Sequence, residues 1–264
     1  MRTDDLRAIG RDLSARISLL RLSGEMKIST GTGAAGDTTF AIDRVAEDII
    51  LTALESLNEP LTVVSEEAGV LDIRGGGQRV VIDPIDGSKN AVSGIPFFCT
   101  SIAVASGDTV GDVVLGYVIN LISGDEFWAE KGAGAWMNGE RIFGQQGEDF
   151  TLVSFEAQHP GEDIQSILPV IKSSVKTRCL GATALDLACI AAGAASIFLS
   201  PSPSRSFDYA GGYLLVKEAG GTISDMAGRP IEPVRLGLER SRTLLAAGNE
   251  RLHEKALGLL QKKG

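Results

Sequence analysis

Acidic residues stand at three places of the 264-residue chain where an apolar stretch ends or a helix is expected to begin. These are Glu66-Glu67, the run Asp83-Pro84-Ile85-Asp86-Gly87-Ser88, and Asp208. Asp83 follows an apolar run and Asp86 comes one tight turn later, so we expect both carboxylates to converge on a common point. Clustered carboxylates without a counter-charge are costly. A divalent cation with oxygen ligands would relieve that cost, and Mg²⁺ is the simplest choice.

A second feature follows directly in the sequence, at Gly87-Ser88-Lys89-Asn90. If a helix begins there, its free backbone N–H groups form an anion site beside the metal, and glycine permits a close approach. A metal cluster next to a phosphate site indicates hydrolysis of a phosphate ester. From the residues alone, an acidic turn that only caps a helix stays open as an alternative. The chain has two histidines, His159 and His253, and neither belongs to a ligand-like pair, which excludes a His-rich zinc site.

These motifs resemble the signatures of the inositol monophosphatase family, in that family's order and spacing. The stretches that carry the resemblance are Ser65-Glu66-Glu67, Ile82-Asp83-Pro84-Ile85-Asp86-Gly87-Ser88-Lys89-Asn90, and Phe207-Asp208-Tyr209-Ala210-Gly211-Gly212 followed by Glu218-Ala219-Gly220-Gly221. The resemblance implies an α+β fold, a layered αβαβα sandwich, and a homodimer. It also implies hydrolysis of inositol monophosphate and/or fructose 1,6-bisphosphate, by in-line attack of a metal-activated water.

The resemblance further implies ligands for two or three Mg²⁺ ions. Glu66, Asp83 and the backbone carbonyl of Ile85 would hold the first ion. Asp83, Asp86 and Asp208 would hold the second. A third, weaker ion would bind Glu66 and the early helix, where Asp43 is the best placed carboxylate.

The remaining implied roles concern the attacking water and the substrate. Ser88, where the family usually has threonine, would orient the water together with Glu66, while Glu67 has either a supporting or a solvated role. Substrate contacts would come from Asp86, Gly87, Ser88, the turn Gly181-Ala182-Thr183 and Arg205. The stretch 201–205 lacks the acid that meets inositol hydroxyls in the family, so Arg205 either meets a second phosphate or lies in solvent. Asp186 either reaches sugar hydroxyls or lies on the polar face of its helix.

The surrounding sequence predicts the elements that position these residues. Apolar residues at helical spacing predict helices over 6–20 and 42–57, separated by a mobile glycine-rich loop at 28–37. A largely antiparallel sheet is expected from position 61, including a hairpin at Asn138-Gly139 and a strand that stops at Asp83-Pro84. The second half alternates strands and helices and closes with a helix over 250–262. We expect two halves, 1–145 and 146–264, that share an interface.

Composition excludes several classes of partner, and two alternative functions stay open. The chain has 25 Lys and Arg against 34 Asp and Glu, a net charge of −9, which argues against nucleic acid or an anionic membrane surface. Its three cysteines are expected to be reduced, and the absence of a secretory or membrane-spanning segment suggests a cytoplasmic protein. The expected partner is a small phosphate ester. The alternatives are a 3′(2′),5′-bisphosphate nucleotidase and a non-catalytic regulator that binds a sugar phosphate.

Overall fold

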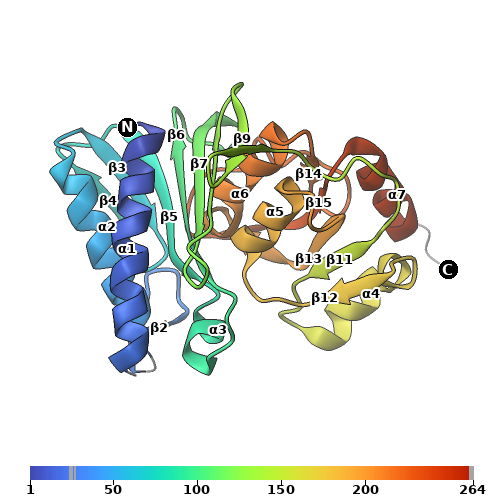
Figure 1. Ribbon diagram of the computed structural model, residues 1–264, viewed down its shortest axis with the longest axis horizontal. Coiled ribbons are helices and arrows are strands. Elements are labelled where there is room, and N and C mark those ends of the chain that lie inside the picture. The colour runs from blue at the N-terminus through green and yellow to red at the C-terminus, as the bar shows by residue number, and fades with distance from the viewer. Residues whose placement is uncertain (24–25, 27, 262–264) are drawn as a thin grey trace.

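Helices and sheets alternate in five layers along the long axis of the molecule (Figure 1). The computed structural model describes residues 1–23, 26 and 28–261. Helices α1 (Thr3–Ser23) and α2 (Ala41–Ser56) form the first layer and an eight-stranded sheet the second. Helices α5 (Thr183–Ala191) and α6 (Ser206–Glu218) form the third. A five-stranded sheet and then α4 (Pro160–Lys172) and α7 (Glu250–Gln261) complete the stack. The predicted αβαβα sandwich is confirmed.

The first layer forms because each of its helices has one apolar side. Leu6, Leu13 and Ile17 of α1 are buried, and they recur at helical spacing with charged residues between them. In α2, Ile42 and Ile50 follow the same rule, and both helices share one core with the neighbouring sheet. The two helices predicted from the apolar spacing are thus confirmed.

The eight-stranded sheet has the order β10-β9-β8-β7-β6-β5-β3-β4. Its strands are β3 (Leu61–Ser65), β4 (Gly69–Ile73), β5 (Gln78–Asp86), β6 (Cys99–Ala105), β7 (Val113–Asn120), β8 (Glu126–Glu130), β9 (Gly134–Met137) and β10 (Glu140–Ile142). Neighbouring strands run antiparallel except β3 and β5. The predicted hairpin between β9 and β10 is confirmed: Asn138 has φ 52° and Gly139 φ 93°, the positive values that such a turn requires.

Strand β5 does not stop at Asp83-Pro84, so that expectation was wrong. The strand continues to Asp86, with Asp83 opposite Ser101 and Asp86 opposite Cys99 of β6. Three steps along β5 therefore match two along β6, which is a β-bulge between Asp83 and Asp86, the stretch that contains Pro84. Proline is tolerated there because an unpaired bulge residue donates no ladder hydrogen bond. Since Ser101 and Cys99 lie on the same face of β6, the bulge brings Asp83 and Asp86 to one face as well.

The early loop is more ordered than the sequence suggested. Strand β1 (Ser29–Thr32) pairs antiparallel with β2 (Thr38–Phe40), so the prediction of a loop was wrong for residues 29–32. Small polar residues carry no alternating apolar pattern, and for this reason the strand could not be predicted. Residues 33–37 form the connection between the two strands.

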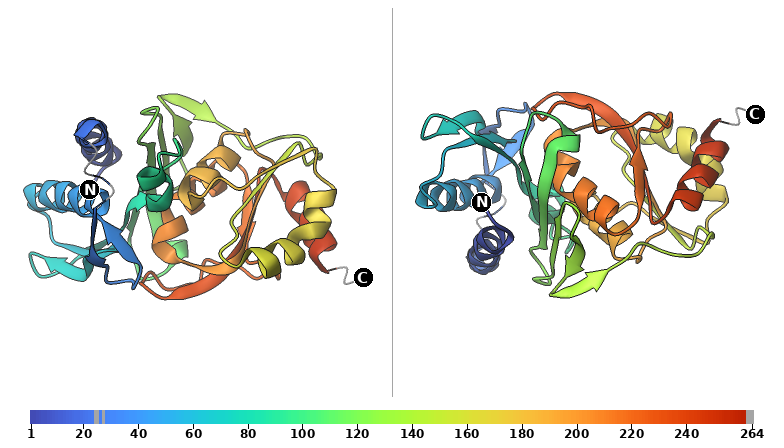
Figure 2. Two further views of the ribbon diagram at one scale, coloured as in Figure 1. Left: turned by 90° about the horizontal axis from the view of Figure 1, so that it is seen from below. Right: turned by 90° about the horizontal axis from the view of Figure 1, so that it is seen from above.

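The second half contains the five-stranded sheet, in the order β12-β11-β13-β15-β14. Its strands are β11 (Leu152–Phe155), β12 (Lys176–Arg178), β13 (Ile197–Arg205), β14 (Thr222–Ser224) and β15 (Arg240–Ala247). Helices α5 and α6 lie between the two sheets, and one hydrophobic core joins them to both (Figure 2). The boundary near position 145 stays a prediction, and position 262 of the predicted last helix lies outside the described residues. Among the described residues, no helix combines the length and apolar character needed to cross a membrane.

Candidate active site

Asp83 and Asp86 lie on the bulged end of β5, where the eight-stranded sheet meets the first turn of α5. Asp83 is 3% exposed, and its Oδ1 is buried with no hydrogen-bond partner within the described chain. Asp86 accepts hydrogen bonds from the N–H groups of Thr183 at 3.1 Å and Ala184 at 2.6 Å. A carboxylate is favourable at this place because the first N–H groups of a helix have no partner inside the helix. Asp86 thereby joins the two halves of the chain at the site.

Ser88 begins the short helix α3 (Ser88–Ser93) and faces Asp43. Its Oγ lies 2.6 Å from Asp43 Oδ1 and 2.8 Å from the carbonyl oxygen of Ile85. Asp43 is the third residue of α2 and also accepts a 2.6 Å hydrogen bond from the N–H of Phe40. The one proton of the hydroxyl can go to either of these oxygens, so Asp43 and the Ile85 carbonyl together hold the Ser88 hydroxyl in place. Orientation of the attacking water by Ser88 together with Glu66 stays a prediction.

Gly87, directly before α3, packs against the turn Gly181-Ala182-Thr183, which was predicted to contact the substrate. Its φ of 91° is a conformation that glycine adopts readily. A Cβ atom at Gly87 would lie 3.0 Å from the carbonyl oxygen of Gly181 and 3.2 Å from Cβ of Ala182. The absence of a side chain thus lets the 87–88 turn and the 181–183 turn pack directly against each other.

Glu66 and Glu67 follow β3 and lie under the connection 33–37. The N–H groups of Ala35 and Ala34 donate to the carbonyl oxygens of Glu66 and Glu67, both at 3.0 Å. The carboxylate of Glu67 accepts a hydrogen bond from the hydroxyl of Thr39 in β2. Glu67 therefore helps to hold the β1–β2 pair in place. This agrees with a supporting role, which was one of the two alternatives predicted for Glu67.

Asp208 is the third residue of α6, and its Oδ2 accepts a 2.7 Å hydrogen bond from the N–H of Arg205. The guanidinium of Arg205 forms an ion pair with Asp37 and donates to the carbonyl oxygen of Ala35 at 2.6 Å. Arg205 is also largely buried, with 8% of its surface exposed. The arginine thus holds the 33–37 connection against α6, and contact with a second phosphate stays a prediction that would require this ion pair to open.

The clustered acids raise one another's pKa. Burial first, and then the charge of Asp208, raise the pKa of Glu66 well above its usual value and that of Asp86 to about 8. Burial and the charge of Glu66 do the same to the pKa of Asp83, and burial raises the pKa of Asp208 to about 6. The pKa of Asp43 is raised by burial as well. The protein without a cation therefore lacks the positive charge that this cluster needs.

This donor set fits a hard divalent cation. All candidate side chains offer oxygen, the donor that Mg²⁺ prefers, and Asp83 Oδ1 is a buried oxygen without a partner. In the described part of the chain, no three Asp, Glu, His or Cys side chains are already arranged so that they could hold an ion. Several of these carboxylates accept hydrogen bonds from the protein, and each still has free lone pairs with which it could bind an ion.

Two acids near α5 differ from expectation. Asp186 is fully buried, so it lies on no solvated face and cannot reach a substrate as it stands. Glu156, which the sequence reasoning missed, follows β11, and its Oε1 accepts a 2.9 Å hydrogen bond from the N–H of Gly181. Burial raises the pKa of Glu156 to about 7. An acid at the end of an apolar strand was the signal used for Asp83, and it would also have found Glu156.

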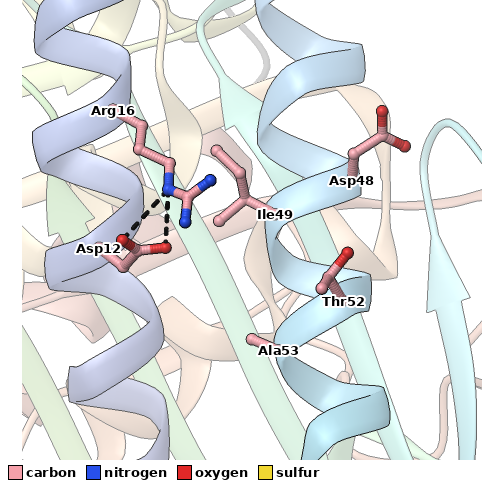
Figure 3. A pocket seen from close by; sticks show the side chains of 6 residues that line it. All are labelled: Asp12, Arg16, Asp48, Ile49, Thr52 and Ala53. Atoms are coloured by element: carbon pink, nitrogen blue, oxygen red, sulfur yellow. Dashed lines mark hydrogen bonds and ion pairs between the residues drawn. The ribbon is translucent and has the colours of Figure 1, made fainter.

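A groove of about 290 Å³ lies elsewhere, between α1 and α2 (Figure 3). Asp12 and Arg16 of α1 form an ion pair on one side, and Asp48 lies on the α2 side. None of the predicted site residues lines the groove, so we do not connect it with the acidic cluster.

Comparison with known proteins identifies the family of this chain. Residues 7–264 match the model of the inositol monophosphatase family. The chain is 36% identical over 240 residues to the fructose-1,6-bisphosphatase/inositol-1-monophosphatase of Methanothermobacter thermautotrophicus, covering 87% of this chain and 85% of that protein. It is 32% identical over 201 residues to the Nus factor SuhB of Escherichia coli, covering 74% of each.

Solved structures include a similar fold. The crystal structure of extragenic suppressor protein suhB from Bartonella henselae superposes with a TM-score of 0.85 and 28% identity, over 99% of this chain and 98% of that one. The match to the family model extends over nearly the whole length of the sequence. On these grounds, and with the acidic motifs in the positions described above, the chain belongs to the inositol monophosphatase family.

Proposed function

We propose that this protein is a Mg²⁺-dependent phosphomonoesterase that hydrolyses inositol monophosphate and/or fructose 1,6-bisphosphate. The coarser statement, that it is a phosphoric monoester hydrolase acting on a small phosphate ester, follows from its family and from the names of its relatives. The observation that carries the proposal is the buried, unpartnered Oδ1 of Asp83 beside Asp86 and the Gly87-Ser88 turn. A cation site and an anion site are adjacent there.

Metal ligands would come from the acids of the cluster. Two or three Mg²⁺ ions would be held by Glu66, Asp83, the carbonyl of Ile85, Asp86, Asp208 and Asp43. When bound, the ions would polarise the phosphate, favour ionisation of a water molecule and neutralise the leaving alkoxide.

Side chains and backbone N–H groups of the protein would orient the attacking water, accept its proton and bind the phosphate. Ser88 Oγ donates its one proton to Asp43 Oδ1 or to the Ile85 carbonyl, and in either case a lone pair of the hydroxyl oxygen can accept a hydrogen bond from the attacking water. Asp43 Oδ1 lies 2.6 Å from the Ser88 oxygen and is therefore placed to receive a proton passed through that hydroxyl. The N–H groups at the start of α3 have no partner within the helix and would hold the phosphate oxygens.

A panel of phosphate esters tests the proposal, with release of inorganic phosphate measured in Mg²⁺ and in EDTA. The panel contains inositol 1-phosphate, fructose 1,6-bisphosphate and adenosine 3′,5′-bisphosphate, the last to test the nucleotidase alternative. We expect Mg²⁺-dependent release from at least one of the first two. Asp83→Asn should lower turnover by two or more orders of magnitude, and Asp48→Asn, an exposed acid on α2, should leave it unchanged. Equal activity of wild type and Asp83→Asn would contradict the site.

A second candidate is a non-catalytic regulator that binds a sugar phosphate, favoured by the similarity to a protein named as a Nus factor. Saturable binding of inositol 1-phosphate without phosphate release from any ester of the panel would support it. We further propose a cytoplasmic location and a homodimer, both carried over from the sequence interpretation. The elution volume of the purified protein tests the dimer.

A further inference from the structure

We propose that Glu156 recognises the hydroxyl groups of the substrate and so selects polyol phosphates over other phosphate esters. The inference rests on the proposed phosphatase function and adds a specificity residue to it. Glu156 does not belong to the metal-ligand set, and it comes from the second sheet rather than the first.

The position of Glu156 is fixed from two sides. Its backbone N–H donates to the carbonyl oxygen of Leu199 in β13 at 2.9 Å, directly beyond the paired parts of β11 and β13. Its Oε1 accepts the N–H of Gly181 at 2.9 Å. The side chain is partly exposed, and within the described chain its Oε2 makes no hydrogen bond. One oxygen is therefore committed to the protein and the other is available to a ligand.

The hydrogen bond to Gly181 places this carboxylate beside the phosphate site. The carbonyl of Gly181 faces Gly87, where an added Cβ would lie 3.0 Å from it, and the N–H of the same residue faces Glu156. The next turn of the chain, at Thr183 and Ala184, holds Asp86. The 181–183 turn therefore links three features of the proposed site. Gly87 packs against the carbonyl of Gly181, Asp86 accepts the N–H groups at the end of the turn, and Glu156 accepts the N–H of Gly181.

The alcohol part of a substrate needs hydrogen-bond acceptors in this region. Sugar and inositol hydroxyls donate, and a carboxylate is the strongest acceptor that a protein offers once the pH exceeds its pKa, which is about 7 for Glu156. The adjacent end of β13 supplies no carboxylate, and its serines are already engaged: Ser200 and Ser204 are buried 3.1 Å from each other, and Ser202 donates to Asp163. Glu156 is thus the carboxylate that remains for the substrate on this side of the site.

A structural role, holding the 181–183 turn, would also explain the hydrogen bond to Gly181. Glu156→Gln separates the two roles, because the amide oxygen still accepts the Gly181 N–H while the anionic oxygen is replaced by a donor. Loss of a structural tie would affect every substrate, whereas loss of a hydroxyl acceptor would affect only substrates that carry hydroxyls.

The test compares two substrates. One is inositol 1-phosphate or fructose 1,6-bisphosphate, whichever the wild type hydrolyses better, and the other is p-nitrophenyl phosphate, which has no hydroxyl on its leaving group. We expect Glu156→Gln to lower kcat/KM about tenfold or more on the polyol phosphate, mainly through KM, and less than twofold on p-nitrophenyl phosphate. Glu162→Gln, an exposed acid in the same half, should change neither. The inhibition constant of free myo-inositol should rise in Glu156→Gln, and that of inorganic phosphate should not.

Two results would overturn this inference and leave the proposed function intact. One is an equal loss of kcat/KM on both substrates in Glu156→Gln, and the other is no loss on either substrate. A wild type that releases phosphate from no ester would instead refute the proposed function, and this inference with it, before any variant is compared. If Glu156→Gln does not fold, Glu156→Asp is measured on the same substrates. Glu156→Asp keeps the charge on a side chain that is one methylene shorter. We expect the same selective loss on the polyol phosphate, and an equal loss on both substrates would again overturn the inference.

Discussion

Without its metal, this protein should lose thermal stability as the pH rises, because several acids are buried together. Burial and the charge of Asp208 raise the pKa of Asp86 from 3.8 to about 8. An acid whose native pKa exceeds its unfolded pKa binds a proton in the native state that it releases on unfolding. The free energy of unfolding is therefore greatest below pH 3.8, the pKa of Asp86 in the unfolded chain, and it falls as the pH rises from 3.8 to about 8.

The size of the effect follows from Asp86. Between pH 5 and pH 7.5, at 1.36 kcal/mol per pH unit, this carboxyl alone accounts for about 3 kcal/mol of lost stability. In a chain of this length that corresponds to a fall in Tm of roughly 6–12 °C. Asp208, with a pKa of about 6, acts in the same direction, but it shares the repulsion with Asp86 and is not added. Burial lowers the pKa of His253, so that residue acts in the opposite direction, stabilising as the pH rises.

Thermal unfolding followed by circular dichroism in EDTA, at pH 5 and pH 7.5, measures the effect. Asp86→Asn should show a markedly smaller difference between the two values than the wild type, while Asp48→Asn should behave like the wild type. Millimolar Mg²⁺ should restore the Tm of the wild type at pH 7.5. The reasoning is refuted if the metal-free wild type is as stable at pH 7.5 as at pH 5, or if Asp86→Asn shows the full wild-type difference.

Three further substitutions test individual parts of the site. Ser88→Ala should lower kcat about 10²-fold or more in phosphate release, because the water loses its acceptor, whereas Ser88→Thr should retain most activity; equal rates for the two variants would contradict this role. Gly87→Ala should destabilise the protein more than Gly124→Ala, by at least ~1 kcal/mol in urea unfolding, since both have positive φ but only Gly87 has close neighbours. Asp37→Asn should speed amide hydrogen exchange of residues 33–37 several-fold, because the half-exposed ion pair to Arg205 is weakened; unchanged exchange would show that the ion pair does not hold this connection.

The acidic motifs of the proposed site could be recognised in advance because the residues that compose each motif are neighbours in the sequence. Asp83 and Asp86 stand in one short run together with Gly87 and Ser88, and the run's composition alone indicates a cation beside an anion. The path of the backbone through that run could not be predicted. Proline normally ends a central strand, and only pairing with β6 shows that β5 accommodates it as a bulge.

The partners of several side chains were beyond local reasoning. The hydrogen bond between Ser88 and Asp43 joins α3 to α2 across 45 positions of sequence, and no local pattern indicated it. Arg205 was expected in solvent or on a phosphate, but it binds Asp37, 168 positions away. Asp186 was expected either at the sugar hydroxyls or on a polar helix face, but α5 lies between two sheets and has no solvated face at that residue.

By itself, the sequence determined the acidic motifs, the helices of the first layer and the Asn138-Gly139 turn, because each depends on side chains within a few positions of one another. Tertiary structure alone decided which acids share a face, that Arg205 holds the 33–37 connection, and that Glu156 lies beside Gly181. These contacts join separate layers of the sandwich. They exist because two sheets pack against α5 and α6, and no local propensity specifies how those layers meet.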